Sequence, residues 1–171
     1  MDKVLFLMRQ DIPFYLLLLL FVSCANHGSS ELGDNLQVKI TYGSGDDFSY
    51  QEEDSTLFFA PYPFSVGHLY NNEDSKEIMV ISKRLDRGDR IKIIPLAKLS
   101  LEDKAGSKQT VILATPIDSE LSIMPSTSFD EFIVSQFSLK QIVEFWYSNR
   151  YGLQGTRVLG WSPASPKDLA V

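Results

Sequence analysis

Apolar and polar residues alternate with a period of two through the middle of the chain, and this alternation predicts β-strands. The clearest case is the segment 37–42, Gln-Val-Lys-Ile-Thr-Tyr, which ends at a Gly-containing turn over residues 43–47. A second strand should stop at Pro61, because proline cannot donate a hydrogen bond to a β-ladder. The predicted strands are 37–42, 56–59, 77–82, 90–99, 109–115 and 156–161.

The pattern changes to helical spacing between the fifth and sixth predicted strands. A short helix is predicted over residues 129–134 and a longer one after it. Ser138 followed by Gln141 resembles a capping box at the start of the longer helix, and Gly152 is placed to end it. The residues of this helix that we expect to face a core are Leu139, Ile142, Val143 and Trp146.

Strands first and helices last predict an α+β domain. Five or six antiparallel strands of this length can form a small, OB-like barrel, and the helices would then flank the barrel at its C-terminal side. We expect this domain to span residues 36–171.

The N-terminus has a different pattern, that of a secretion signal. Lys3 and Arg9 precede an apolar run at 12–22, which is much shorter than the roughly 20 residues that a membrane-spanning helix needs. The small residue Ser23 and then Cys24, the single cysteine of the chain, follow this run. This arrangement resembles a bacterial lipobox. The open alternatives are an ordinary secretory signal and a cysteine buried in a short core helix.

The lipobox resemblance implies that residues 1–23 are a lipoprotein signal peptide, and that the Cys24 thiol becomes lipidated after cleavage. The polar residues 24–35 would then tether the domain to the membrane. We therefore expect a lipoprotein of the bacterial cell envelope, anchored on the periplasmic or outer-surface side. The sequence leaves the choice of membrane and the oligomeric state open.

Charge and motifs exclude several classes of function. The formal net charge is −6 and no run of Lys or Arg is present, which argues against a nucleic-acid partner. His27 and His68 are the only histidines, and neither stands in a serine-histidine-acid motif. The sequence also lacks a Gly-rich phosphate loop of the P-loop type.

Four segments between Tyr62 and Trp161 resemble, in order, the family I (soluble) inorganic pyrophosphatases. Residues 61–67 resemble the family's Tyr-Pro-x-Asn-Tyr-Gly turn, and 72–81 resemble its Asp-Gly-Asp-Pro-Leu-Asp signature with the strand that follows. Residues 87–106 resemble its central strand and Asp-Glu-Ala-Gly loop, and 142–161 its C-terminal helix and Gly-Trp strand. The resemblance implies a five-stranded barrel with flanking helices and, as activity, Mg²⁺-dependent hydrolysis of diphosphate.

The resemblance also implies roles for individual residues. Asp74, Glu77 and Asp103 would be metal ligands, since Mg²⁺ prefers carboxylate and water oxygens. Asp74 would in addition be catalytic, and Arg150 would bind substrate. On local sequence alone, residues 72–74 could equally form a polar turn between two strands.

Several positions depart from the family's pattern, and together they weaken the implied metal site. Asn72 stands where the family's signature has its first Asp, and Lys108 stands where the next loop has its second Asp. Each lost carboxylate removes a ligand and a negative charge, and Lys108 adds a positive charge. The family's two Lys and two Tyr that contact substrate correspond to Ser49, Thr110, Val66 and Asn149.

Two classes of function follow. One is an enzyme, either a divergent, lipid-anchored inorganic diphosphatase or a hydrolase of a related phosphoanhydride, with the diphosphatase activity impaired or lost through these substitutions. The other is a catalytically silent domain that binds a phosphorylated ligand or a protein partner in the envelope.

Overall fold

A computed structural model describes residues 36–52, 55–72, 74–150 and 156–169 of this chain. The predicted signal peptide, Cys24 and the tether lie outside these ranges, as does Gly152. None of the helices found within the described ranges is both long and apolar enough to cross a membrane.

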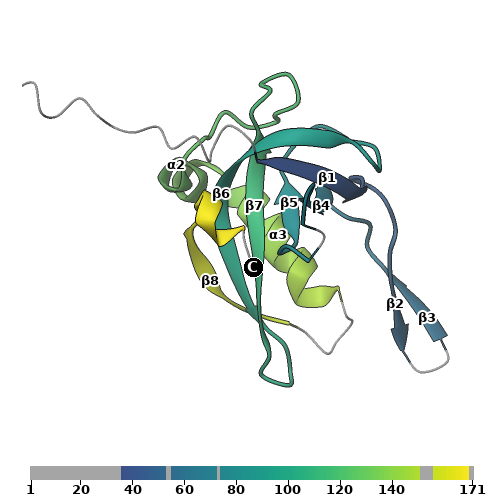
Figure 1. The fold of residues 1–171 in the computed structure, drawn as a ribbon. Helices are drawn as coiled ribbons and strands as arrows, with labels where there is room; N and C mark the ends of the chain where they lie inside the picture. Colours follow the sequence, from purple (N-terminus) through teal and green to yellow (C-terminus); the bar gives the residue numbers. More distant parts are fainter. Residues whose placement is uncertain (1–35, 53–54, 73, 151–155, 170–171) are drawn as a thin grey trace, which may run out of the picture. The chain divides into compact units, whose positions relative to one another are not determined.

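A six-stranded mixed sheet is the centre of the domain (Figure 1). Its strands follow the order β1-β4-β5-β7-β6-β8, and β1 also pairs with β6, so that five strands close into a ring and β8 extends it. This confirms the predicted α+β class. The prediction of purely antiparallel strands is wrong at one pair, because β5 runs parallel to β7. The strands are β1 Gln37–Tyr42, β4 Ser65–Leu69, β5 Ile78–Val80, β6 Arg90–Glu102, β7 Lys108–Pro116 and β8 Arg157–Pro163.

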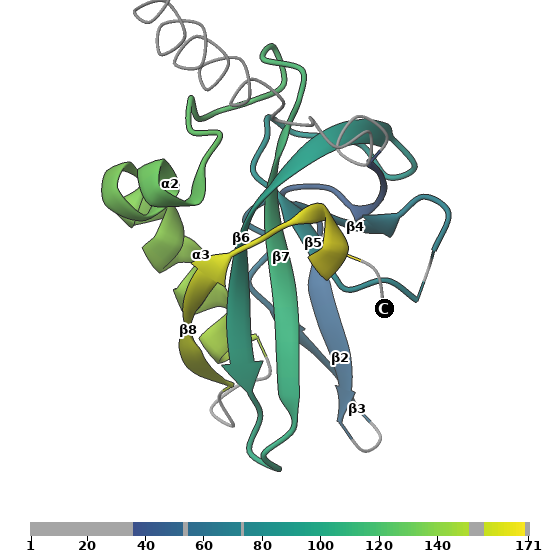
Figure 2. The same ribbon diagram turned by 60° about the vertical axis from the view of Figure 1, so that its left-hand side comes forward.

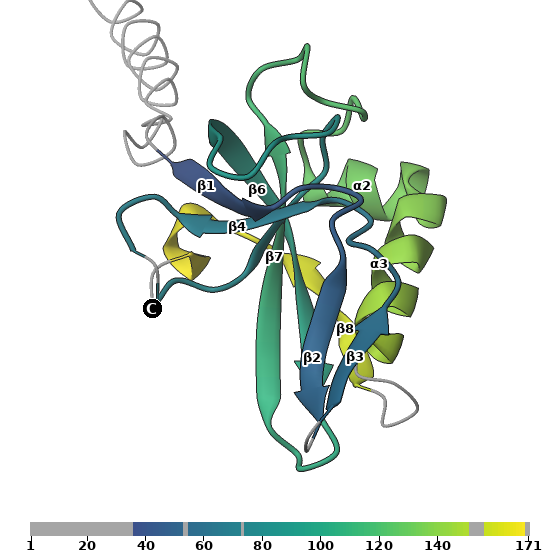
Figure 3. The ribbon, with the colours of Figure 1, turned by 90° about the vertical axis from the view of Figure 1, so that its right-hand side faces the viewer.

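Two strands were not predicted from the sequence pattern. The first is β2 (Phe48–Glu52), which pairs with β3 (Ser55–Phe59), a predicted strand, in a separate two-stranded sheet. Figure 3 shows this sheet beside the ring. The second is β4, which overlaps the end of residues 61–67, the segment that resembles the family's turn. Gly67 interrupts the apolar alternation of this strand. Gly67 is needed there, because a Cβ at this position would lie 2.2 Å from the Lys39 carbonyl oxygen of β1.

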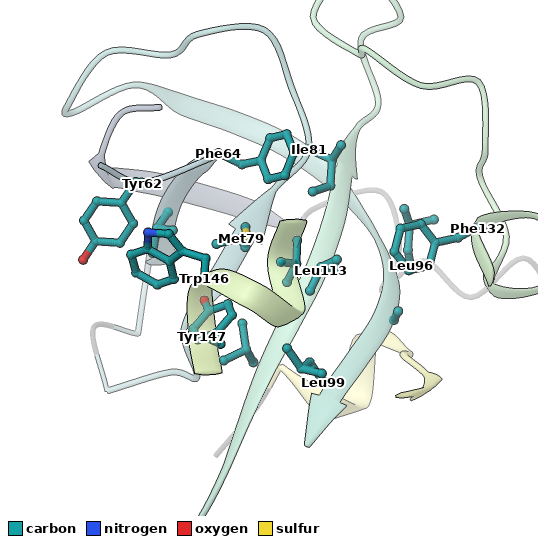
Figure 4. Packing of buried hydrophobic residues seen from close by; sticks show 14 of the residues in the cluster. Tyr62, Phe64, Met79, Ile81, Leu96, Leu99, Leu113, Phe132, Trp146 and Tyr147 are labelled. Carbon is teal, nitrogen blue, oxygen red and sulfur yellow. The ribbon is translucent and has the colours of Figure 1, made fainter. Parts of the chain in front are cut away.

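Buried apolar residues form two clusters on opposite sides of the same strands. One cluster fills the ring and includes Val38, Ile78 and Ile112. The other lies between the outer surface of β5, β6 and β7 and the helices, and Figure 4 shows its members. β5 and the middle of β7 are buried on both faces, which is why residues 78–81 and 111–114 are apolar without alternation.

Helices α2 (Phe129–Ser135) and α3 (Phe137–Asn149) lie on one side of the sheet (Figure 2). α3 buries Val143, Trp146 and Tyr147. The expectation that Ile142 faces the core is wrong, because this side chain is 45% exposed and Tyr147 lies on the buried face instead.

The predicted capping box of α3 is also wrong. α3 begins at Phe137, directly after Gln136, which is at once the C-cap of α2 and the N-cap of α3 and makes no side-chain capping bond. Because α3 follows α2 directly, Ser138 lies inside α3 and does not serve as its cap.

The C-terminal residues close the ring cluster. A 3₁₀ turn at Pro166–Asp168 places Leu169, which is fully buried, in the cluster inside the ring. Asp168 holds this turn to the sheet, since its carboxylate lies 2.8 Å from Lys98 Nζ and its backbone carbonyl accepts a hydrogen bond from Lys76 Nζ at 2.9 Å.

Candidate functional site

Glu77 and Arg150, two of the residues predicted for the site, lie in direct contact. Glu77 immediately precedes β5, where its carbonyl oxygen accepts a hydrogen bond from Ile112 N of β7 at 3.0 Å. Arg150 is the C-cap residue of α3, and its Nη1 donates to Glu77 Oε1 at 3.1 Å. The Tyr147 hydroxyl donates to the same carboxylate oxygen. The sheet and the helix thus bring a carboxylate, a guanidinium and a phenol to one point.

Aromatic rings surround this ion pair. The Arg150 guanidinium carbon lies 4.6 Å from the centroid of the Tyr147 ring, 5.5 Å from that of Trp146 and 5.9 Å from that of Phe48. Tyr62 packs on Trp146 with centroids 4.8 Å apart, and Figure 4 shows Tyr62, Trp146 and Tyr147 close together. Arg150 is only 5% exposed. The guanidinium is therefore held in place and shielded from solvent.

Tyr147 is a permanent donor in this arrangement. Burial of the phenol raises its pKa well above the ordinary value, and the negative charge of Glu77 raises it further. The hydroxyl thus keeps its proton at neutral pH. Arg150 therefore supplies a positive charge to Glu77, and Tyr147 supplies a hydrogen bond from a neutral hydroxyl.

Asp74 and Asp103 lie in turns. Asp74 is exposed in the turn between β4 and β5, in which Asn72 accepts a backbone hydrogen bond from Ser75 at 3.1 Å. Asp103 Oδ1 accepts a hydrogen bond from Ser107 N at 2.8 Å in the turn between β6 and β7. These contacts are those of turn residues. The catalytic role of Asp74 stays a prediction.

The described residues do not fit a magnesium cluster. Within the ranges that the structure describes, no three side chains of His, Cys, Asp or Glu gather in a group that could hold a metal ion. Asp74, Glu77 and Asp103 are not gathered into such a group among these residues, and their role as metal ligands stays a prediction. Glu77 is instead engaged by Arg150 and Tyr147.

The substituted positions agree with this picture. Val66 is buried among apolar side chains, so it offers no polar group to a ligand. Asn149 donates its side-chain amide to the Phe145 carbonyl at 2.7 Å, within α3. Lys108 is exposed at the start of β7, where it stands opposite Glu102.

Tyr147 is the residue that sequence reasoning missed. It lies four residues after Val143 and three before Arg150, so all three share one face of a helix. That spacing was available in the sequence. It was overlooked because Ile142 was assigned to the core face in its place.

Comparison with known proteins gives the fold. Neither the models of known protein families nor curated protein sequences match this chain. Solved structures of inorganic pyrophosphatases do. The Helicobacter pylori enzyme has a TM-score of 0.58 and 19% identity over 80% of this chain and 90% of its own. The Thermus thermophilus enzyme has a TM-score of 0.55 and 16% identity over 85% and 95% of the two chains.

A third structure is the vacuolar soluble pyrophosphatase of Trypanosoma cruzi, solved in complex with PPi, with a TM-score of 0.62 and 8% identity over 78% of this chain and 65% of its own. At these identities the likeness establishes the fold. The domain has the fold of the inorganic pyrophosphatases, which confirms the fold that the sequence resemblance implied.

Proposed function

We propose that this chain is a lipid-anchored protein of the bacterial envelope whose pyrophosphatase-fold domain hydrolyses diphosphate slowly or not at all and acts as a binding domain. The observation that carries the proposal is the contact of Glu77 with Arg150 and Tyr147. In the resemblance, the Glu77 carboxylate is a Mg²⁺ ligand.

A guanidinium at hydrogen-bond distance acts against a metal ion at the same carboxylate. Two like charges about 4–6 Å apart repel by an energy on the order of kcal/mol even when solvent partly screens them. Arg150 is buried and ringed by aromatic side chains, so it cannot readily swing away. Mg²⁺ would have to displace a charge that the fold holds in position.

The rest of the site points in the same direction. Asn72 and Lys108 together replace two carboxylates by a neutral and a positive side chain. Diphosphate is highly charged, and its hydrolysis in a site of this kind relies on several metal ions that neutralise it and activate water. With too few carboxylates to gather those ions, the domain retains the fold without the means for the reaction.

The proposed location in the cell envelope supports a role other than diphosphate removal. Secretion directed by residues 1–23 and lipidation of Cys24 would put the mature domain outside the cytoplasm, whereas the diphosphate that biosynthesis releases is produced inside it. The proposed ligand is accordingly a phosphorylated molecule or a protein partner of the envelope.

A phosphate-release assay on the full chain in neutral detergent tests the proposal. With diphosphate and either Mg²⁺ or Mn²⁺ supplied, we expect no release above the rate without protein. A rate in the range of about 1–10³ s⁻¹, as for ordinary enzymes, would make the domain a diphosphatase. Loss of that rate in Asp74→Asn and in Asp103→Asn would assign the catalysis to those carboxylates.

Restoring the carboxylates provides a second test. Asn72→Asp with Lys108→Asp removes one positive charge and adds two negative charges near the implied site. We expect calorimetry to detect tighter Mg²⁺ or Mn²⁺ binding than in the wild type. The double variant combined with Arg150→Gln should bind metal more tightly still, because the guanidinium no longer competes for Glu77.

A further inference from the structure

The outer side of α2 and α3 is apolar, although no element of the described chain covers it. Figure 3 shows the two helices at the edge of the domain. The exposed residues between positions 134 and 149 are four apolar ones, two serines and Gln141, so none of them is charged. The apolar residues are 83%, 59%, 45% and 67% exposed, in the order Val134, Phe137, Ile142 and Phe145. We call these four residues and Gln141 the outer helix face.

This face differs from the outer side of an ordinary solvated helix, which carries charged and polar residues. Only two residues of α3 are charged, Lys140 and Glu144, and both are half-buried. Glu144 is engaged on the side of the sheet, where it accepts a hydrogen bond from Trp161 Nε1 of β8. The inner face of α3 is apolar as well, because it packs in the core. A helix that is apolar on both faces is normally buried on both.

The exposed apolar area is large enough for a specific interface. At about 150–200 Å² for each large apolar side chain, the exposed parts of the four side chains come to roughly 400 Å². A standard protein–protein interface buries about 800 Å² on each partner, and a little over half of that area is apolar. The outer helix face thus supplies most of the apolar area that one side of a stable dimer needs.

The order of the residues on this face fits a second copy of the chain as the partner. Phe137, Gln141 and Phe145 are spaced by four residues and lie along one stripe of α3. The stripe is symmetric about Gln141. When two such helices pack antiparallel about a two-fold axis at Gln141, each Phe137 meets the Phe145 of the other copy, and the two Gln141 amides meet each other. An amide both donates and accepts hydrogen bonds, so it can pair with its own copy.

Charge supports the same partner. Each copy carries a formal net charge of −6, so two copies repel each other in most orientations. A face without charged side chains lets them approach with the least repulsion. A basic partner would instead be expected to meet acidic residues, and the exposed acidic residues of α2, Asp130 and Glu131, lie in its first turn, outside the outer helix face.

We propose that the outer helix face is the interface of a homodimer in which two α3 helices pack antiparallel about a two-fold axis. The dimer covers the second apolar face of α3. This inference goes beyond the proposed function and does not depend on it. We expect a dissociation constant on the order of micromolar, the weak end of the range for interfaces of standard size. Far below that concentration the chain is a monomer, and its unfolding then reports on the single chain.

Sedimentation velocity of the full chain in neutral detergent, at concentrations from well below to well above micromolar, tests the dimer. We expect a monomer at the lowest concentration and a dimer at the highest. Phe137→Lys and Phe145→Glu each set an unpaired charge against a phenyl ring in the interface, so each should weaken the dimer by at least about tenfold. If either variant loses its circular dichroism spectrum, Gln141→Lys takes its place, because it sets two ammonium groups against each other at the axis.

A mixture of the two variants tests the antiparallel arrangement. In a dimer of one Phe137→Lys chain and one Phe145→Glu chain, the new ammonium faces the new carboxylate across the axis. An equimolar mixture should therefore dimerise at least about fivefold more tightly than either variant alone. A mixture that dissociates as readily as the separate variants rules out the antiparallel dimer.

Ile117→Lys and Ile117→Glu are matched controls, because Ile117 is an apolar residue that is 45% exposed in the connection after β7. Each should change the dissociation constant by less than about twofold, since a surface substitution outside the interface has a small effect. The proposal is overturned if the wild type stays monomeric at the highest concentration, if the Phe variants leave the dimer intact, or if the controls weaken it equally. A positive phosphate-release assay would contradict the proposed function and leave this result unaffected.

Discussion

Glu77 has different neighbours in the structure from those that the resemblance implies. In the resemblance it is a metal ligand, and in the structure its carboxylate accepts hydrogen bonds from Arg150 and Tyr147. The guanidinium supplies the positive charge that a metal ion would otherwise provide. Because Arg150 is buried among aromatic rings, the pair connects the end of α3 to the residue that precedes β5.

The sign of a stability change distinguishes these two roles. In a metal-free carboxylate cluster, Glu77→Gln would relieve repulsion and raise the free energy of unfolding. In the ion pair, the same change removes the carboxylate charge that faces a buried guanidinium, so we expect a loss of about 3 kcal/mol. Urea unfolding measures it, with Glu120→Gln as the exposed control. An increase, or a loss that appears only with Mg²⁺, would contradict the ion-pair role.

Asp168 predicts a pH dependence of the protein's stability. The hydrogen bond from Lys98, and then that from the Ser165 hydroxyl, lower its pKa from 3.8 to about 2. A carboxyl whose pKa is lowered by folding stabilises the protein above its unfolded pKa, and this contribution disappears as the pH falls from about 4 to about 2.

Asp168→Asn should therefore reduce the free energy of unfolding at neutral pH by about 1–2 kcal/mol, and the difference from the wild type should vanish near pH 2. Denaturant titrations at several pH values check this. Asp118→Asn, at an exposed position, is the control. A difference that persists unchanged at low pH would show that the carboxylate charge does not stabilise the turn.

At the scale of elements, α3 holds the two parts of the fold together. Its buried face packs on the sheet, and Trp146 Nε1 donates to the carbonyl oxygens of Ala60 at 3.1 Å and Pro61 at 3.0 Å. Those carbonyls belong to the connection between β3 and β4. The helix thus joins the long central sheet to the segment that leaves the two-stranded sheet.

Trp146→Ala should cost about 3–5 kcal/mol of unfolding free energy, because it empties a large buried volume and removes the donor from two carbonyls. Phe145→Ala is a matched control, since the adjacent ring is 67% exposed and its loss should change stability by no more than about 0.5 kcal/mol. Thermal and urea unfolding compare the two. Equal effects would show that α3 is not anchored through Trp146.

At the scale of the whole molecule, the proposed anchor determines where the domain acts. Lipidation at Cys24 would hold the domain at a membrane surface, where phosphate-bearing headgroups and envelope proteins are the available ligands.

Cys24→Ser should leave the precursor without lipid, because only the thiol forms the thioether to diacylglycerol. Metabolic labelling with a radioactive fatty acid in a bacterial host should give a signal for the wild type and none for the variant. Ser23→Thr, next to it, retains the thiol and is the control for a change in the segment. Equal labelling of wild type and Cys24→Ser would rule out this anchor.

Most of the elements could be predicted from the sequence because their patterns are local. The alternation in 37–42 reproduces β1, and the predicted short helix differs from α2 by one residue at its end. β4 and β2 could not be predicted in this way. Gly67 interrupts the alternation of β4 and is explained only by the approach of β1, and β2 is defined by its pairing with β3.

The site was predictable only in part, for a related reason. The sequence singled out Glu77 and Arg150, which are 73 positions apart, through the family resemblance, and the structure does bring them together. It gave no means of knowing that they would contact each other instead of a metal or a substrate. Ile142 and Tyr147 show the same limit on a smaller scale, because a helix with apolar residues on several sides can bury either face until its partner is known.

The sequence by itself determined the α+β class, the order of the main strands and helices, the acidic charge and the pyrophosphatase resemblance, because each of these depends on residue type and local spacing. Only the tertiary structure decided that β1 closes the ring through β6, that Arg150 neutralises Glu77, and that Lys39 stands between His68 and Arg90. These are pairings between distant segments. Their register depends on how whole faces pack, and no local pattern in the chain specifies it.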